Sequence, residues 1–147
     1  MEQNKYIPGD WVIDKMDLPP GYVQIKQISE TFGKETLILK SGWAVYSNDV
    51  EPIPLTFEIL KKIGWELREH HKKEYYEDVE WYEFLNRPVT YISLRFYPEE
   101  EAFSPFLYRE EISEKPIQYV HQLQHLLFGL GLDSNFDLTD TKEGGEK

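Results

Sequence analysis

Short apolar runs separated by turn residues dominate the first third of the chain. Within these runs apolar and polar residues alternate, which is the period of a strand with one buried face. The predicted strands cover residues 11–13, 22–28, 35–40, 43–46 and 50–53. Short strands joined by tight turns are typical of a small barrel. The sequence therefore predicts an SH3-like β-barrel over residues 5–54, a fold that by itself implies no function.

A short helix is predicted at Thr56–Ile63, because apolar residues recur there every three or four positions. The hydroxyl of Thr56 can accept a hydrogen bond from an orphan backbone N–H at the start of the helix. Lysines at positions 61 and 62 suit the negative end of the helix dipole. Gly64 fits the left-handed position just beyond the helix.

Antiparallel strands and a closing helix are predicted for the rest of the chain. Val89–Tyr97 shows the clearest strand pattern, with an apolar face at its even-numbered positions. Pro116 precedes a helix predicted at Ile117–Leu130. The predicted fold class is α+β. Its second part, residues 55–133, can share one core with the barrel, and residues 134–147 read as a disordered polar tail.

Charge narrows the choice of partner. The 147 residues carry a formal charge of −11, and residues 65–147, with 18 Asp/Glu and 9 Lys/Arg, contribute −9 of it. Direct nucleic-acid binding is not expected, because a phosphate backbone is held by Lys and Arg. The acidity indicates either a solubilising surface, or a surface that attracts a basic partner or mimics nucleic acid.

Other features of the composition bear on location. The chain has no cysteine, which excludes disulfides and thiolate chemistry. The first ten residues are polar and show no signal-peptide pattern. No run approaches the roughly 18 apolar residues of a membrane span. We therefore expect a cytoplasmic protein that does not enter a membrane.

The predicted last helix carries a polar set that is a candidate binding site. His121 and His125 have the spacing of a helical metal pair, but Gln122 stands where a metalloprotease has its glutamate. No third ligand is in register, so no metal is predicted. The pair lies opposite the apolar face and is expected to meet solvent or a partner. Gln122 and Gln124 either cap backbone groups or contact that partner.

A second candidate binding site is an acidic, aromatic stretch. Its rings are Tyr75, Tyr76, Trp81 and Tyr82, interleaved with Glu and Asp. Half of them can be core, whereas the exposed half can anchor a basic protein. The alternative is ordinary sheet packing with charged edges. In the barrel, aromatic residues either line a peptide groove or fill the core: Trp11, Tyr22, Trp43 and Tyr46.

Two segments resemble a family of small uncharacterised bacterial proteins that occur in prophages and other mobile elements. One runs from Val50 to Trp65 (VEPIPLTFEILKKIGW) and the other from Tyr119 to Leu130 (YVHQLQHLLFGL), with Gly9-Asp10-Trp11-Val12 before them. The family pattern has Asn where this chain has His125, a departure that weakens a metal role for the helix. The resemblance implies a bacterial or phage setting and no established activity.

These observations favour a non-catalytic protein-interaction module of a bacterial phage or mobile element. A first alternative is an acidic nucleic-acid mimic that inhibits a host nucleic-acid-binding protein. A second is an enzyme with an unrecognised carboxylate or histidine site. No nucleophile elbow, phosphate loop or dinucleotide fingerprint occurs, so neither catalytic residues nor a cofactor is predicted. The partner's identity and the oligomeric state stay open.

Overall fold

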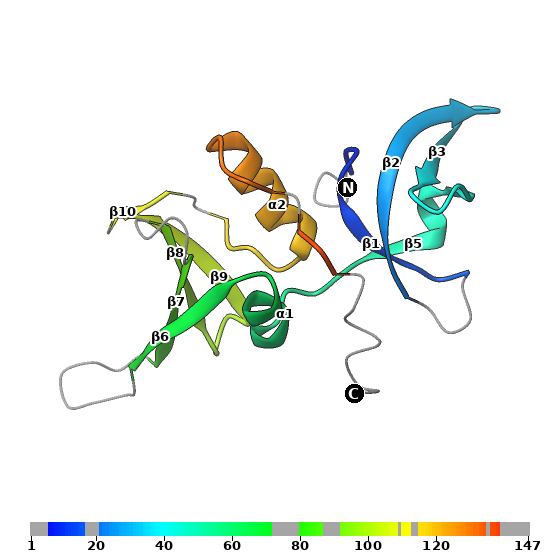
Figure 1. Ribbon diagram of the computed structural model, residues 1–147. Coiled ribbons are helices and arrows are strands. Elements are labelled where there is room, and N and C mark those ends of the chain that lie inside the picture. The colour runs from blue at the N-terminus through cyan, green and yellow to red at the C-terminus, as the bar shows by residue number, and fades with distance from the viewer. Residues whose placement is uncertain are drawn as a thin grey trace. The chain divides into compact units, whose positions relative to one another are not determined.

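The computed structural model describes residues 6–16, 21–71, 80–86, 92–108, 110–112, 115–134 and 136–138 (Figure 1). Antiparallel strands dominate it, together with two α-helices and one short 3-10 helix. The elements are β1 (Trp11–Asp14), β2 (Gly21–Thr31), β3 (Lys34–Leu39), β4 (Ala44–Tyr46), η2 (Ser47–Asp49), β5 (Val50–Pro52), α1 (Phe57–Lys62), β6 (Trp65–His71), β7 (Trp81–Asn86), β8 (Ile92–Tyr97), β9 (Ala102–Leu107), β10 (Glu110–Glu111) and α2 (Val120–Gly129). The predicted α+β class is thereby confirmed.

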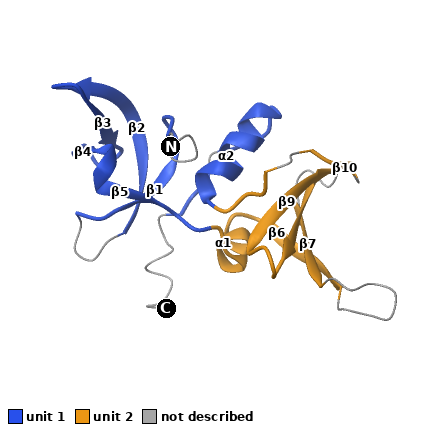
Figure 2. Ribbon diagram, turned by 180° about the vertical axis from the view of Figure 1, so that it is seen from behind, with its two compact units in different colours: residues 1–54, 119–147 blue, residues 55–118 orange. Residues whose placement is uncertain are grey.

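The chain divides into two compact units, each with its own sheet (Figure 2). Unit 1 comprises residues 1–54 and 119–147, and unit 2 comprises residues 55–118. Unit 2 is therefore an insertion between β5 and α2 of unit 1. Pro54 and Tyr119, which flank the insertion, form an antiparallel bridge. The sequence had grouped the last helix with the second part of the chain, whereas the structure groups it with unit 1.

The sheet of unit 1 has the strand order β4-β3-β2-β1-β5. All of its pairs are antiparallel, and an irregularity in the pairing of β2 with β3 falls between Ile25 and Gln27. Such irregularities bend a strand, and β2 curves visibly in Figure 1. Among the described strands, β4 and β5 are the sheet edges and are not paired with each other. The strands predicted in residues 5–54 are thus present, and closure into a barrel stays a prediction.

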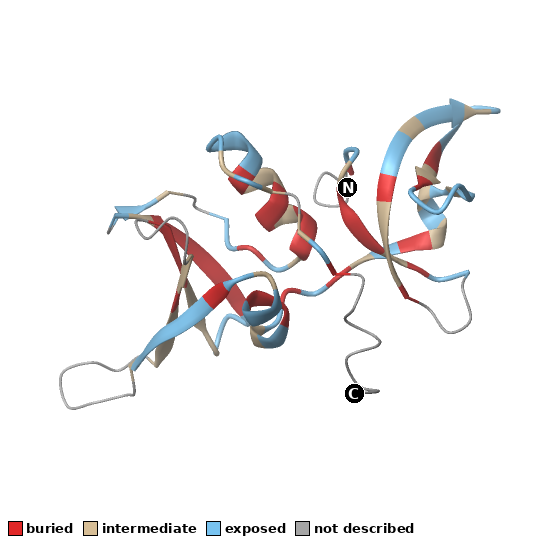
Figure 3. Ribbon diagram, in the orientation of Figure 1, coloured by how far each residue is buried: buried red, intermediate tan, exposed pale blue. Residues whose placement is uncertain are grey.

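A cluster of buried apolar side chains forms a core of unit 1. Its members are Tyr6, Val12, Ile25, Leu37, Leu39 and Val50. In α2, Val120, Leu123 and Leu127 are also buried, all at most 1% exposed. Figure 3 shows that buried positions occupy the first part of α2, whereas its C-terminal end is exposed.

The residues after α2 differ from the disordered tail predicted from position 134. Leu138 is only 1% exposed, and the indole N–H of Trp11 donates to the carbonyl of Phe136 over 3.0 Å. These contacts attach the segment to β1, because a buried indole N–H requires an acceptor. Residues 139–147 lie outside the described part of the chain.

Unit 2 consists of a sheet with the strand order β10-β9-β8-β7-β6 and of α1, which packs against one face of that sheet. The predicted capping of α1 is confirmed: the N–H of Ile59 donates to the hydroxyl of Thr56, and Gly64 has a φ of 104°. Phe57 of α1 packs edge-on against sheet aromatics, with ring centroids 4.7 Å from Phe84 and 5.1 Å from Phe96. This aromatic layer is the core of unit 2 and leaves the other face of the sheet open for a site.

Neither of the two described helices combines the length and the apolar character that a membrane span needs.

Candidate functional site

The histidine face of α2 is mostly buried, which corrects the expectation that it meets solvent or a partner. His121 is 1% exposed, and its ring lies 5.1 Å from that of Tyr6 in an edge-on arrangement. The side chain of His125 is 34% exposed. The helical period identified the apolar face correctly but could not show that residues 6–11 cover the opposite face as well. As a result, both faces of the first part of α2 carry buried side chains.

The two glutamines of this helix bind backbone groups. Gln122 accepts a hydrogen bond from the N–H of Tyr119 over 3.1 Å and so caps the start of α2. Gln124 is 4% exposed. Its oxygen accepts from the N–H of Trp11 over 3.0 Å, and its amide nitrogen donates to the carbonyls of Gly9 and Ser134 over 2.8 and 3.1 Å. The capping alternative from the sequence therefore describes both side chains.

A carboxylate just before β1 forms hydrogen bonds with the second histidine. Asp10 is 1% exposed, and Nε2 of His125 lies 2.8 and 3.0 Å from its two oxygens. The N–H of Ile7 also donates to this carboxylate over 2.9 Å. Neither surface cavity described below includes Asp10 or His125. This pair links α2 to the residues just before β1.

Tyr6 gives this cluster a measurable pH dependence. Burial raises the pKa of its phenol to about 12, and the nearby Asp10 carboxylate adds to the effect. The unfolded phenol ionises near its ordinary pKa of about 10. The neutral phenol thus stabilises the fold fully below about pH 10, and this contribution is lost as the pH rises towards about 12.

We expect the free energy of unfolding to fall between about pH 10 and pH 12, and Tyr6→Phe to flatten part of that fall. Urea unfolding across this range measures both chains. Tyr108→Phe is the control, because that side chain is 72% exposed. Equal slopes for the original chain and Tyr6→Phe would contradict the assignment.

The acidic, aromatic stretch is split between the two faces of the unit 2 sheet. Trp81 stacks on His71 with centroids 3.8 Å apart, and Tyr82, next along β7, stacks on His70 at 4.0 Å. Tyr82 also lies 5.1 Å from Phe57, on the core side. Tyr75 and Tyr76 lie outside the described residues. Of this predicted set, Trp81 is the ring that the structure places in the wall of a pocket.

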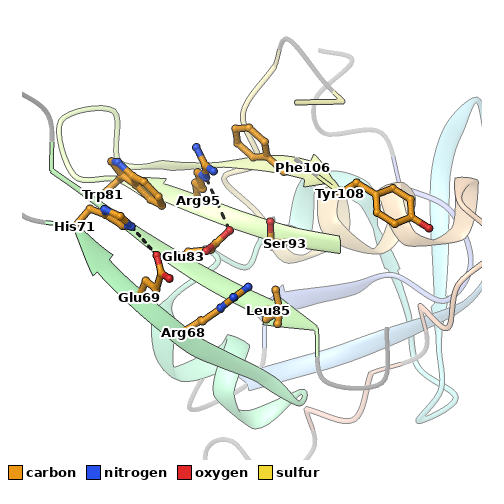
Figure 4. Close-up of a pocket in the computed structure, with 10 residues that line it drawn as sticks. All are labelled: Arg68, Glu69, His71, Trp81, Glu83, Leu85, Ser93, Arg95, Phe106 and Tyr108. Atoms are coloured by element: carbon orange, nitrogen blue, oxygen red, sulfur yellow. Dashed lines mark hydrogen bonds and ion pairs between the residues drawn. The ribbon is translucent and has the colours of Figure 1, made fainter. Parts of the chain in front are cut away.

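This pocket, here called the Arg95 pocket, is a cavity of about 480 Å³ on the open face of the unit 2 sheet (Figure 4). It is lined by Arg68, Glu69, His71, Trp81, Glu83, Leu85, Ser93, Arg95, Phe106 and Tyr108. Strand pairing explains why they meet, because Glu83 faces Arg95 and Ser93 faces Phe106 across neighbouring strands. Ser93, 8% exposed, is a small residue between larger neighbours.

Arg95 is the central charge of this pocket. Its guanidinium carbon lies 4.2 Å from the ring centroid of Trp81 and 4.3 Å from that of Phe106. Its Nε is buried and has no hydrogen-bond partner among the described residues, and Oε2 of Glu83 lies 4.0 Å from it. A buried donor left without an acceptor costs about 1–3 kcal/mol. Stacking therefore holds the guanidinium in place while its hydrogen-bonding capacity is incompletely used.

A second cavity lies in unit 1 beside an exposed tryptophan. This Trp43 groove, of about 800 Å³, is lined by Asp14, Met16, Val23, Thr31, Thr36, Ser41, Trp43, Ala44, Val45, Tyr46 and Asp49. Trp43 is 75% exposed, whereas Trp11 is 3% exposed. Of the two alternatives predicted for these aromatic residues, filling the core therefore describes Trp11 but not Trp43. Trp43 follows the tight turn at Gly42, φ 102°, and directly precedes the edge strand β4.

Sequence reasoning missed Arg95 and Phe106 as site residues. The alternation of β8 did place Arg95 on the polar face of that strand. The sequence signal that could have identified the site is a single arginine on the polar face of this strand, followed by a neighbouring strand that contains an aromatic residue. For metals, no group of three or more suitable side chains occurs in the described portion of the chain.

Comparisons with known proteins add no assignment to this geometry: no protein-family model matches the chain, and no match was found among curated proteins or among solved structures.

Proposed function

We propose that the protein is a non-catalytic interaction module that binds an extended segment of another protein in the Trp43 groove. The observation that carries this proposal is the exposure of Trp43 above an apolar groove. Exposed large apolar surfaces rimmed by polar residues mark interaction sites. Tryptophan supplies much contact area at low entropic cost and is enriched among residues that dominate binding energy.

Charge indicates the kind of segment. Among the described residues, the lining of the groove includes two carboxylates, Asp14 and Asp49, and no Lys or Arg, while Nζ of Lys34 lies 5.1 Å from the ring centroid of the lining residue Tyr46. An exposed indole attracts a cation over its face. We therefore propose a partner segment with a Lys or Arg beside apolar residues. The strand order of unit 1, with β1 between β5 and β2, supports the SH3-like barrel that we propose for this unit. The mode of binding is that of aromatic grooves that hold extended peptides.

The setting that we propose is the cytoplasm of a bacterium, with the gene in a phage or another mobile element. The charge of −11 fits a basic partner protein, because complementary charges steer encounter and fix orientation. A nucleic-acid mimic is the alternative that the same charge supports.

Selection from a library of random short peptides tests the groove. We expect peptides with Lys or Arg next to apolar residues to be enriched on the full chain. Trp43→Ala should weaken these peptides at least about tenfold, while Phe128→Ala, the loss of another exposed ring, leaves them unchanged. Enriched peptides that bind Trp43→Ala as well as the original chain would rule out the groove.

The salt dependence of binding distinguishes the interaction module from the nucleic-acid mimic. Capture from a host lysate at low salt and at about 0.5 M salt shows whether binding depends only on charge. A partner kept at high salt and lost with Trp43→Ala supports the interaction module. A nucleic-acid-binding protein that is lost at high salt and unaffected by Trp43→Ala supports the mimic.

A further inference from the structure

The guanidinium of Arg95 in unit 2 is held in place by neighbouring rings. Its guanidinium carbon lies 4.2 Å from the ring centroid of Trp81 and 4.3 Å from that of Phe106, so the group is held between two aromatic rings (Figure 4). A guanidinium edge presents parallel donors that match the two oxygens of a planar anion. Because the rings set the orientation of this edge, little conformational entropy is lost when an anion binds.

The guanidinium of Arg95 has hydrogen-bonding capacity that such an anion can use. Its Nε is buried without an acceptor among the described residues, and Glu83 stays at 4.0 Å, beyond hydrogen-bond distance. The other glutamate of the pocket is engaged elsewhere, since Oε1 of Glu69 lies 2.6 Å from Nε2 of His71. Neither carboxylate of the pocket therefore makes the hydrogen bonds that the guanidinium offers.

The charge of the pocket selects among anions. Arg68 and Arg95 carry two positive charges, and Glu69 and Glu83 carry two negative ones. A dianion such as phosphate would add two charges to a pocket whose formal charges already cancel. A monoanion adds one, and it can be held by the paired donors of Arg95. The balance thus favours a carboxylate over a phosphate.

The remaining walls favour a carboxylate attached to an apolar body. Leu85 and the rings of Phe106 and Tyr108 line the pocket, and Tyr108 is 72% exposed. Ser93, almost buried, has a side chain small enough to leave space beneath them. The volume of about 480 Å³ lies within the range of small-ligand sites, about 300–1,000 Å³.

From these observations we propose that the Arg95 pocket binds a monocarboxylate that carries an apolar or aromatic group. The guanidinium edge of Arg95 takes the carboxylate, and the body rests against Phe106, Tyr108 and Leu85. The same chemistry is offered by a small free acid and by the C-terminus of a peptide that ends in an apolar residue. This site does not depend on the Trp43 groove, which belongs to the other unit.

Titration of the full chain with N-acetylphenylalanine and with its amide, followed by NMR shifts, tests the carboxylate. We expect the acid to bind with a Kd of about 1 mM or tighter, and the amide at least about tenfold more weakly. Arg95→Lys keeps the charge but loses the planar pair of donors, and should weaken the acid about tenfold. Inorganic phosphate should bind more weakly than the acid.

Control variants distinguish binding by Arg95 itself from a general effect of positive charge. Lys62→Gln removes a charge on α1, on the covered side of the same sheet, and should leave binding unchanged where Arg95→Gln abolishes it. If Lys62→Gln and Arg95→Gln weakened binding equally, the effect would come from the general electrostatic field of the protein, and the proposal would be overturned. It is also overturned if the acid and amide bind alike, if phosphate binds more tightly, or if no binding occurs at about 10 mM.

A short peptide ending in phenylalanine, with a free or an amidated C-terminus, identifies the source of the carboxylate. Tighter binding of the free-ended peptide than of N-acetylphenylalanine assigns the pocket to a protein C-terminus. Binding no tighter than that of N-acetylphenylalanine assigns it to a small free acid.

Discussion

Replacing Gln124 by leucine should lower the free energy of unfolding by about 2–4 kcal/mol. Leucine fills a similar volume but offers no polar atom, so the N–H of Trp11 loses its acceptor. The carbonyl of Ser134 loses a donor, whereas that of Gly9 keeps the amide of Gln24 at 2.9 Å. The cost is large because Gln124 and Trp11 are 4% and 3% exposed, and water cannot replace the lost bonds without opening the structure.

Urea unfolding of the full chain measures this loss. Gln122→Leu is the matched control on the same helix: it removes the acceptor of the N–H of Tyr119 at a half-buried helix end. We expect it to cost about 1 kcal/mol, the usual value of a helix cap. Equal effects of the two substitutions would contradict the role assigned to Gln124.

Phe84→Ala should destabilise the chain by about 3–5 kcal/mol. Phe84 is fully buried on β7, and its ring lies 4.7 Å from that of Phe57 and 6.2 Å from that of Phe103. Alanine removes one of the sheet rings that pack against Phe57 of α1, and the surrounding rings cannot all collapse into the cavity. The loss is thus expected in the core that supports the strands of the Arg95 pocket.

Phe128→Ala is the control for this substitution, because Phe128 is 69% exposed and should change stability by less than about 0.5 kcal/mol. Chemical denaturation followed by circular dichroism compares the two variants. A loss below about 1 kcal/mol for Phe84→Ala would show that the aromatic layer contributes little to the stability of unit 2.

Local signals allowed α1 to be predicted almost to the residue. Thr56 and Gly64 mark its two ends by hydrogen bonding and by a positive φ, and both effects act within a few residues. The second helix was predicted to begin at Ile117 but begins at Val120. Ile117 and Tyr119 instead form bridges with Phe103 and Pro54. Tertiary pairing therefore competed successfully with helix formation in those residues.

The candidate sites depended more on distant partners than on local pattern. His121 and Gln124 lie on the less apolar side of α2 and are buried because Tyr6 and the start of β1 cover that side. The hydrogen bond between Trp11 and Gln124 joins residues 113 positions apart, and no local sequence period can predict such a contact. Likewise, the environment of Arg95 requires the register that places β9 beside β8.

The insertion of unit 2 into unit 1 has a consequence for synthesis on the ribosome. The bond between Trp11 and Gln124 spans 113 positions. At about 5–20 residues per second, roughly 6–23 s separate the synthesis of its two ends. Throughout that interval the strands of unit 1 lack α2, whereas all of unit 2 is made before α2 appears. Unit 2 can thus fold first, and the emerging unit 1 sheet would expose its α2-binding surface to chaperones or to other nascent chains.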